Sequence, residues 1–136
     1  MIKKFLFAFI LISIGFSAQG QYITELPGTD YKYRTLHMAD DYAGKVVCTL
    51  VKRKPVCKDG PAILYVHGYN DYFFQRALGD SAATHGYNFY ALDLRKYGRS
   101  ILPDQDAFFA KNLSEYFADL DTAIAIIKAE GNRDII

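Results

Sequence analysis

The sequence predicts an α/β fold in which parallel strands are joined by a helix. Two short apolar runs, Ile63 to Val66 and Phe89 to Leu94, each lead into a polar turn that contains glycine. The segment between them, Phe74 to His85, is compatible with a helix, and Gly86 follows it as a typical helix terminator. A connection of this length joins parallel strands. Because ligands of such sheets bind beyond the carboxyl ends of the strands, the two turns are the first places to look for chemistry.

Length and composition agree with one folded domain. The chain has 136 residues, of which 51% are hydrophobic, and this is enough to form a packed core. Its 16 basic and 15 acidic residues leave a formal charge of +1, so composition indicates no basic surface for nucleic acid and no attraction to an anionic membrane. We therefore expect neither nucleic acid nor a membrane as a partner.

The amino terminus has the pattern of a secretory signal peptide. Lys3 and Lys4 precede an almost wholly apolar run over residues 5–16, and small residues follow at positions 18–20. The apolar run is shorter than the roughly 20 residues of a membrane-spanning helix, although an uncleaved anchor is the alternative. The sequence predicts a signal peptide over residues 1–20, a domain over 21–136 that begins at Gln21, and export to the periplasm or the extracellular space.

The first part of the domain has the pattern of an antiparallel hairpin. Residues from Tyr31 to Met38 alternate between apolar and polar, and Val46 to Lys52 has the β-branched composition of a strand. Asp40, Asp41 and Gly44 mark a short connection between them.

Two cysteines, Cys48 and Cys57, are the only ones in the chain. Cys48 lies in the second predicted strand and Cys57 in the following loop, Arg53 to Gly60. In an oxidising compartment they either pair or stay free thiols, and their spacing leaves both alternatives open. Two cysteines without clustered histidines supply too few ligands for zinc, so the sequence predicts no metal site and no cofactor.

The rest of the chain continues the α/β pattern. Ile63 to Val66 is apolar on both faces, as expected of a central strand covered by helices on both sides. A loop from Arg95 to Lys111 leads to Asn112 and Glu115, which are spaced like a capping box at the start of a helix that ends near Gly131. The predicted apolar face of this helix comprises Leu113, Tyr116, Phe117, Leu120, Ile124 and Ile127. Residues 134–136 have the pattern of a further strand.

These elements carry a resemblance to a known family. A strand that ends in His67-Gly68, followed by a helix and then by a strand with the turn D-L-R-K-Y-G-R-S over 93–100, resembles the amino-terminal half of an α/β-hydrolase. The resemblance covers Tyr31 to Ile136 and is greatest to the lysophospholipase, monoacylglycerol lipase and serine aminopeptidase-like branch. The family usually has glycine where Lys96 stands.

The resemblance implies a serine hydrolase that cleaves ester or amide bonds of a small acyl substrate. Acyl transfer builds negative charge on a carbonyl oxygen, and fixed backbone N–H donors stabilise that charge. By resemblance, the backbone N–H of Tyr69 is one oxyanion donor, and the residue after the nucleophile supplies the other. His67 and Gly68 are expected to shape the turn, with Gly68 allowing a sharp bend and His67 acting as a hydrogen-bonding residue.

The catalytic residues of such an enzyme are not recognisable in the sequence. Ser100 lacks the second glycine of a G-x-S-x-G turn, and Ser81 falls inside the first predicted helix. His37 and His85 lie at positions typical of a strand surface and a helix end. We therefore expect the fold to be truncated before the nucleophile strand is complete, with the nucleophile, acid and histidine outside this chain, and the chain alone to be inactive.

Other interpretations of the sequence lead to different expectations. Asp93 and Arg95 follow the second parallel strand, and a charged pair at that place is expected to fix the loop rather than to react. A non-catalytic α/β domain completed by a partner chain is the alternative function. A dinucleotide-binding domain is disfavoured because no G-x-G-x-x-G turn follows the first strand.

Overall fold

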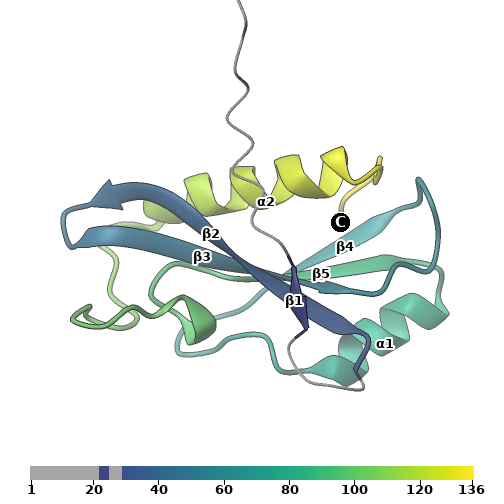
Figure 1. Ribbon diagram of the computed structural model, residues 1–136, viewed down its shortest axis with the longest axis horizontal. Helices are drawn as coiled ribbons and strands as arrows, with labels where there is room; N and C mark the ends of the chain where they lie inside the picture. The colour runs from purple at the N-terminus through teal and green to yellow at the C-terminus, as the bar shows by residue number, and fades with distance from the viewer. Residues whose placement is uncertain (1–21, 25–28) are drawn as a thin grey trace, which may run out of the picture.

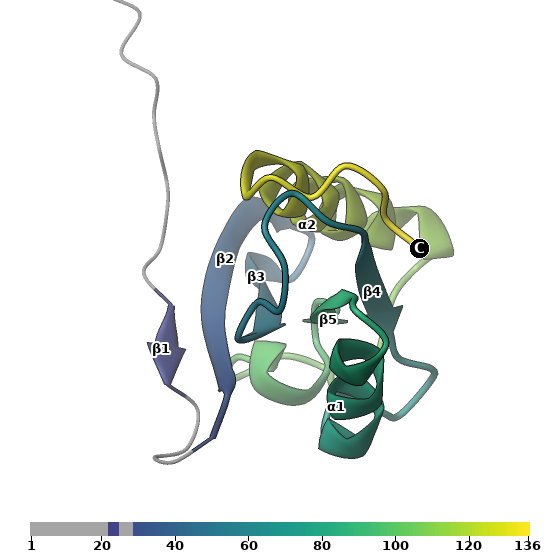
Figure 2. The same cartoon turned by 90° about the vertical axis from the view of Figure 1, so that its right-hand side faces the viewer.

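A five-stranded mixed sheet with a helix on each face forms the centre of the fold (Figures 1 and 2). The computed structural model describes residues 22–24 and 29–136, so the predicted signal peptide lies outside the described residues. The strands are β1 (Ile23–Thr24), β2 (Tyr31–Asp41), β3 (Gly44–Arg53), β4 (Ala62–Val66) and β5 (Asn88–Asp93), in the spatial order β1-β2-β3-β5-β4. The helices are α1 (Arg76–Thr84) and α2 (Phe117–Ala129), with short 3₁₀ turns η1 (Gly98–Ser100) and η2 (Leu113–Tyr116).

The predicted hairpin is confirmed and is longer than the sequence pattern indicates. Strands β2 and β3 pair antiparallel with Thr35 opposite Thr49, and only Tyr42 and Ala43 separate them. Gly44, the first residue of β3, has a φ of +95°, a conformation that glycine adopts without steric cost.

The predicted strand, helix, strand unit is also confirmed. Strands β4 and β5 pair in parallel with Leu64 opposite Tyr90, and α1 connects them. The helix starts at Arg76 rather than Phe74, and Gly86 follows it with a φ of +84°. This left-handed residue ends the helix as expected.

Ile63 to Val66 was expected to form a central strand; β4 is the last of the five named strands, but both of its edges are paired. Strand β5 is inserted between β3 and β4, and every residue of β5 is buried. Val66, at the end of β4, is 40% exposed. The outer edge of β4 is paired by a parallel bridge between Ala62 and Ile135, so residues 134–136 do begin to pair with the sheet as predicted.

Alternation along β3 and β5 divides the core into two clusters. Cys48, Leu50 and Leu92 lie on the α2 face of the sheet, in the cluster that includes Ala123 and Ile127 of that helix. Side chains of the opposite alternation, among them Val51, Phe89 and Ala91, pack on the α1 face with Phe73 and Ala82. Both faces of the two strands are therefore buried, which explains their continuous apolar sequences.

The start of the last helix differs in detail from the predicted capping box. The Asn112 side chain accepts a hydrogen bond from the Ser114 N–H at 3.0 Å, as an N-cap does. Glu115 reaches back to the N–H of Lys111 at 2.9 Å rather than to that of Asn112. The first turn is the 3₁₀ turn η2, and α2 begins only at Phe117.

The face of α2 that packs on the sheet is rotated from the predicted one. Asp119, Ala123 and Ile127 are buried, whereas Leu113 is 75% exposed and Phe117 is 60% exposed. The prediction was wrong for these two residues because apolar side chains occur on several sides of the helix. The sheet packs against the side of α2 that carries the small residue Ala123.

The two cysteines are free thiols in this structure. Cys48 is buried in β3, and Cys57 is partly exposed in the loop before β4, where its Sγ lies 3.4 Å from the Gly86 carbonyl oxygen. Burial, together with the negative charge of Asp119, raises the pKa of the Cys48 thiol above its ordinary value. Cys48 is thus a core residue with little thiolate at neutral pH.

This difference predicts unequal thiol reactivity. Under native conditions, Ellman's reagent should titrate about one thiol per chain, and about two after unfolding in denaturant, because only an accessible thiolate reacts quickly. Cys57→Ser should abolish the fast reaction, whereas Cys48→Ser should leave it intact. A native chain with no titratable thiol before reduction would show that the two cysteines form a disulfide.

Two further features concern only the described residues. No helix there is both long and apolar enough to cross a membrane. The same part of the chain contains no group of three or more His, Cys, Asp or Glu side chains that could hold a metal ion.

Candidate functional site

The turn after β4 is held in place by His67. Its Nε2 accepts a hydrogen bond from the backbone N–H of Leu94 at 3.0 Å, so the ring carries its proton on Nδ1 and donates it to the Gly68 carbonyl oxygen at 2.8 Å. His67 is 7% exposed. The Nε2 bond thus joins the turn after β4 to the end of β5, and the Nδ1 bond holds the ring within its own turn.

Tyr69 follows this anchored pair at the carboxyl end of the sheet. Its side chain is 80% exposed, and its backbone N–H has no hydrogen-bond acceptor among the described residues. The left-handed residue of the turn is Asn70, with a φ of +53°, and not Gly68. The expected sharp bend at Gly68 therefore falls two residues later. A Cβ added at Gly68 would meet no atom within 4 Å, so Gly68 leaves open space beside Tyr69.

An open cleft of about 520 Å³ adjoins this turn. It is lined by the turn after β4, by the loop after β5 and by η2; the lining residues are His67, Gly68, Tyr69, Leu94, Tyr97, Phe108, Ala110, Asn112, Leu113 and Tyr116. None of these lining residues is an acid, a lysine or an arginine. The cleft therefore offers an uncharged, mostly apolar surface next to the Tyr69 N–H.

Aromatic rings form the wall of the cleft. The Tyr97 ring lies 4.7 Å from the His67 ring and 5.3 Å from the Phe108 ring, measured between centroids. Phe108 in turn lies 6.3 Å from Tyr69. Burial and a hydrogen bond to Tyr97 raise the pKa of Tyr116, so its hydroxyl is neutral at physiological pH. The wall is therefore uncharged and built of rings that contact one another.

Asp93 fixes the turn that follows β5. This fully buried carboxylate accepts hydrogen bonds from the Phe73 N–H at 2.9 Å and from Arg99 Nη1 at 2.7 Å. Gly98 is required here, because its φ is +48° and an added Cβ would lie 2.4 Å from the Cβ of Tyr72. The Y-G-R-S motif is therefore a structural turn organised around Asp93.

Arg95 also fixes the loop by hydrogen bonds, as expected, but its partner is not the one that Asp93 bonds to. Asp119 of α2 accepts two hydrogen bonds from the Arg95 guanidinium group, Nη2 to Oδ1 at 2.7 Å and Nε to Oδ2 at 3.1 Å. It also accepts the Arg95 backbone N–H at 3.0 Å. Although burial opposes the charge, the bonds to Asp119 raise the pKa of Arg95. This pair joins the loop after β5 to α2.

The described serines and histidines do not form a catalytic pair. Ser100 is fully buried, and its hydroxyl donates to the Asp93 carbonyl oxygen at 2.8 Å. Ser81 lies within α1, as predicted, and His85 forms the end of that helix. His37 is exposed on β2. No serine hydroxyl in the described part of the chain is hydrogen-bonded to a histidine ring.

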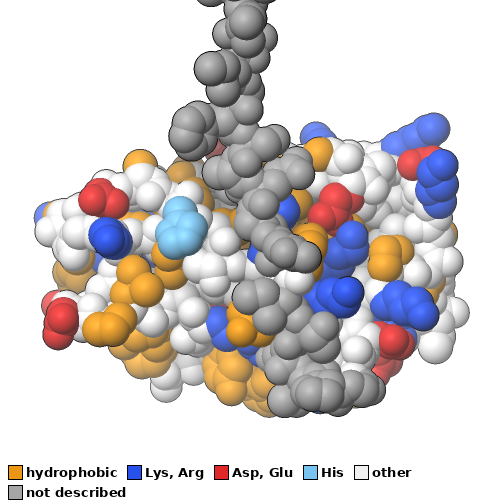
Figure 3. Space-filling model, in the orientation of Figure 1, with side chains coloured by type: hydrophobic (Ala, Val, Ile, Leu, Met, Phe, Trp, Pro, Cys, Tyr) orange, Lys and Arg blue, Asp and Glu red, His pale blue; other side chains and the backbone are white. Residues whose placement is uncertain are grey.

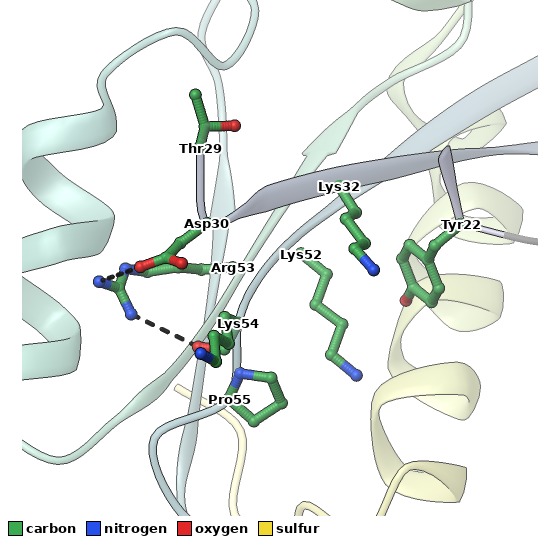
Figure 4. Close-up of a pocket in the computed structure, with 8 residues that line it drawn as sticks. All are labelled: Tyr22, Thr29, Asp30, Lys32, Lys52, Arg53, Lys54 and Pro55. Atoms are coloured by element: carbon green, nitrogen blue, oxygen red, sulfur yellow. Dashed lines mark hydrogen bonds and ion pairs between the residues drawn. The ribbon is translucent and has the colours of Figure 1, made fainter. Parts of the chain in front are cut away.

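A second cavity, of about 380 Å³, lies at the other end of the sheet (Figure 4). It contains Lys32, Lys52, Arg53 and Lys54, and Figure 3 shows Lys and Arg side chains gathered over this half of the face. Lys52 is opposite Tyr90, near the amino end of β5, so this cavity is remote from the carboxyl ends of β4 and β5. Arg53 is paired with Asp80 at 2.8 Å, and Lys52 is paired with Glu130 at 2.6 Å. The cavity therefore offers cations that are already partly neutralised.

Comparison with known proteins shows the fold. No protein-family model matches the sequence, and neither does any curated protein sequence. Among solved structures, a probable hydrolytic enzyme from Pseudomonas aeruginosa matches 71% of this chain with a TM-score of 0.56 and 17% identity. A cold-adapted esterase from an Arctic intertidal metagenomic library matches 86% with a TM-score of 0.56 and 18% identity. An epoxide hydrolase from Vigna radiata matches 79% with a TM-score of 0.54 and 20% identity.

The described residues form part of the α/β-hydrolase fold. The matches cover 30%, 52% and 31% of those three solved structures, respectively, so this chain corresponds to a third to a half of each. In this chain that part comprises a mixed sheet in which an antiparallel hairpin precedes parallel strands. At these identities the likeness concerns the fold, and the chemistry of this protein is a separate question.

Sequence reasoning located the turn but missed most of the cleft wall. Phe108 lies in the long loop, and only the folded chain brings it against Tyr97 and Tyr69. Asp119 was also missed. Its signal was present, because Asp119, Ala123 and Ile127 repeat at intervals of four along the helix, which is the spacing of a buried stripe.

Proposed function

We propose that this chain supplies the oxyanion side of a serine hydrolase that cleaves ester or amide bonds. The observation that carries the proposal is the Tyr69 N–H, which lacks an acceptor among the described residues and lies at the carboxyl end of β4 beside the cleft. A fixed N–H at this place can bind the oxygen on which negative charge develops during acyl transfer. The α/β-hydrolase fold supports the assignment, since ligands of such sheets bind at this end.

The anchoring of the turn supports this role. A donor stabilises a developing charge best when it is already in position, because no free energy is then spent on orienting it during the reaction. His67 provides that order, since it bonds to Gly68 at 2.8 Å and to Leu94, the residue that follows β5, at 3.0 Å. In this proposal His67 is a structural residue and not the general base.

The cleft suggests where the apolar part of the substrate binds. Tyr97, Phe108 and Leu113 provide an uncharged wall next to the Tyr69 N–H. An acyl chain or another neutral group in the cleft would remove apolar surface from water, at about 25 cal/mol for each Å² buried. We therefore propose a lysophospholipase-like ester as substrate. Besides the cold-adapted esterase, structural neighbours from Pyrococcus furiosus and Paenibacillus are described as esterases, which agrees with ester chemistry.

The proposal places the nucleophile, the acid and the histidine base outside these 136 residues. It is supported by the positions of Ser81 and Ser100, one within a helix and the other buried, and neither hydroxyl is bonded to a histidine ring in the described part of the chain. We also propose that the protein is exported, on the basis of the basic and apolar pattern over residues 3–16.

A fluorophosphonate probe tests this assignment, because it labels a serine only when a base activates it. The chain of residues 21–136 alone should not be labelled and should not hydrolyse 4-nitrophenyl esters. The natural protein that contains these residues should be labelled at a serine in a G-x-S-x-G turn. Labelling at Ser81 or Ser100, or a natural protein that is silent toward both probe and esters, would contradict the proposal.

A further inference from the structure

Lys96 is buried in an unusual place for a lysine. Its side chain is 2% exposed, and its Nζ donates to Asp41 Oδ2 at 2.9 Å and to the Tyr42 hydroxyl at 3.3 Å. Asp41 ends β2, and Tyr42 is the first residue of the hairpin turn. Lys96 is 55 residues from Asp41 in sequence, so the contact ties the tip of the hairpin to the loop after β5.

The backbone of Lys96 has the conformation that glycine favours. Its φ is +63°, in the left-handed region, where a side chain is disfavoured. Lys96 therefore has the backbone conformation that glycine favours, and its side chain contacts the hairpin. The hydrogen bonds to Asp41 and Tyr42 raise the pKa of Lys96 although burial acts against its charge.

Lys96 is also connected directly to the cleft wall. Its carbonyl oxygen accepts a hydrogen bond from the Phe108 N–H at 3.0 Å, across the base of the loop. The ring of the next residue, Tyr97, packs at a tilt against the His67 ring, with 4.7 Å between the centroids. Any displacement of Lys96 would thus move Tyr97 and Phe108, two rings of the cleft wall, relative to the turn that His67 anchors.

Tyr42 contacts the other end of the same loop. Lys111 Nζ lies 3.8 Å from the centre of the Tyr42 ring, and Lys96 Nζ lies 4.4 Å from it. The Tyr42 hydroxyl also donates to Glu115 at 3.3 Å. The hairpin tip therefore contacts both ends of the segment 96–111, and a cation on an aromatic face contributes a favourable electrostatic attraction.

We propose that Lys96 is a positioning residue: its bonds to Asp41 and Tyr42 make the hairpin tip a clasp that holds the 96–111 loop, and with it the cleft wall, against the His67 turn. The inference rests on the proposed function only in that the cleft is taken as the substrate site. The clasp itself follows from the contacts, and it assigns a role to the β2–β3 turn, which does not touch the cleft.

Two variants remove the side-chain contacts of the clasp and leave the backbone conformation of Lys96 unchanged. Lys96→Gly keeps a left-handed conformation, which glycine adopts freely, and removes only the side chain. Asp41→Asn removes the charge that Lys96 faces and keeps an oxygen for the Ala43 N–H, which Asp41 Oδ1 accepts at 2.7 Å. Asp40→Asn is the matched control, because Asp40 is the exposed neighbour in the same strand and its side chain has no hydrogen bond or ion pair within the described part of the chain.

Amide hydrogen exchange and the NMR shift of the His67 ring protons are the measurements. In Lys96→Gly and Asp41→Asn, exchange of the Phe108 N–H should accelerate by about tenfold or more, while amides at the centre of β3 and β5 keep their rates. The His67 ring shift should move, because the Tyr97 ring lies 4.7 Å from it and its ring current acts on the His67 protons. Asp40→Asn should change neither.

Two outcomes would overturn the proposal. If Phe108 exchange and the His67 shift stay unchanged in both variants, the clasp does not position the loop. If all amides accelerate together, Lys96 contributes only to global stability. Neither measurement needs a substrate, so failure of the clasp is distinguishable from failure of the proposed acyl chemistry, which probe labelling tests separately.

Discussion

Replacing Asp119 with alanine should destabilise the fold by about 3 to 5 kcal/mol, because it leaves a buried guanidinium without its partner. Asp119 is fully buried and Arg95 is 6% exposed, so water cannot replace the lost bonds without a rearrangement. The Arg95 backbone N–H would also lose its acceptor. The loss is expected as a lower urea midpoint, followed by circular dichroism.

Asp121→Ala provides the matched control. Asp121 lies two residues later in α2 and is exposed, and no ion pair involves it among the described residues. Its replacement should change the free energy of unfolding by no more than about 0.5 kcal/mol. Asp119→Asn should fall between the two, since it keeps an oxygen acceptor. If Asp119→Ala and Asp121→Ala have the same midpoint, the buried pair does not hold the loop to α2.

Replacing Tyr69 with proline should have the largest effect on catalysis. In the active protein that contains this turn, Tyr69→Pro deletes the backbone N–H, and loss of one oxyanion donor typically lowers turnover on the order of a hundredfold to a thousandfold. The effect should fall on kcat rather than on KM, because the oxygen carries its full charge only in the transition state. Steady-state hydrolysis of a 4-nitrophenyl ester measures both.

Tyr69→Ala distinguishes the contribution of the Tyr69 backbone N–H from that of its aromatic ring. It keeps the N–H and removes a side chain that is 80% exposed, so turnover should fall far less than in the proline variant. Any loss should be seen mainly in KM, since the ring contributes to the wall of the cleft beside Phe108. A correctly folded Tyr69→Pro protein with the turnover of the parent would show that this N–H is not an oxyanion donor.

Much of the fold was predictable because its signals are local. Alternation in β2, apolar runs in β4 and β5, and Gly86 at the end of α1 each reflect burial or backbone conformation within one segment. The candidate turn at His67 was predictable for the same reason, since it directly follows a strand. The start of α2 was less predictable, because the Glu115 side chain can bond to the N–H of Asn112 or to that of Lys111, and it bonds to Lys111.

The candidate site needed contacts between segments that are distant in sequence. The partners of Asp93 and Arg95 illustrate this, because the two residues are only two positions apart and yet bind groups on opposite faces of the sheet. Asp93 bonds to Phe73 and Arg99, and Arg95 bonds to Asp119 of α2. Sequence spacing suggested that the two charges act together, and it carries no information about which way each side chain turns after the strand ends.

By itself, the sequence determined the hairpin, the strand, helix, strand unit and the place of the turn at His67, because periodicity and glycine positions encode burial and backbone conformation directly. Only the tertiary structure decided that β5 lies between β3 and β4, that Leu113 and Phe117 are exposed, and that Lys96 reaches the hairpin tip. The physical reason is that these features depend on how whole elements pack and on which distant groups then come within bonding distance. The sequence of one segment encodes neither the packing of whole elements nor the contacts between distant groups.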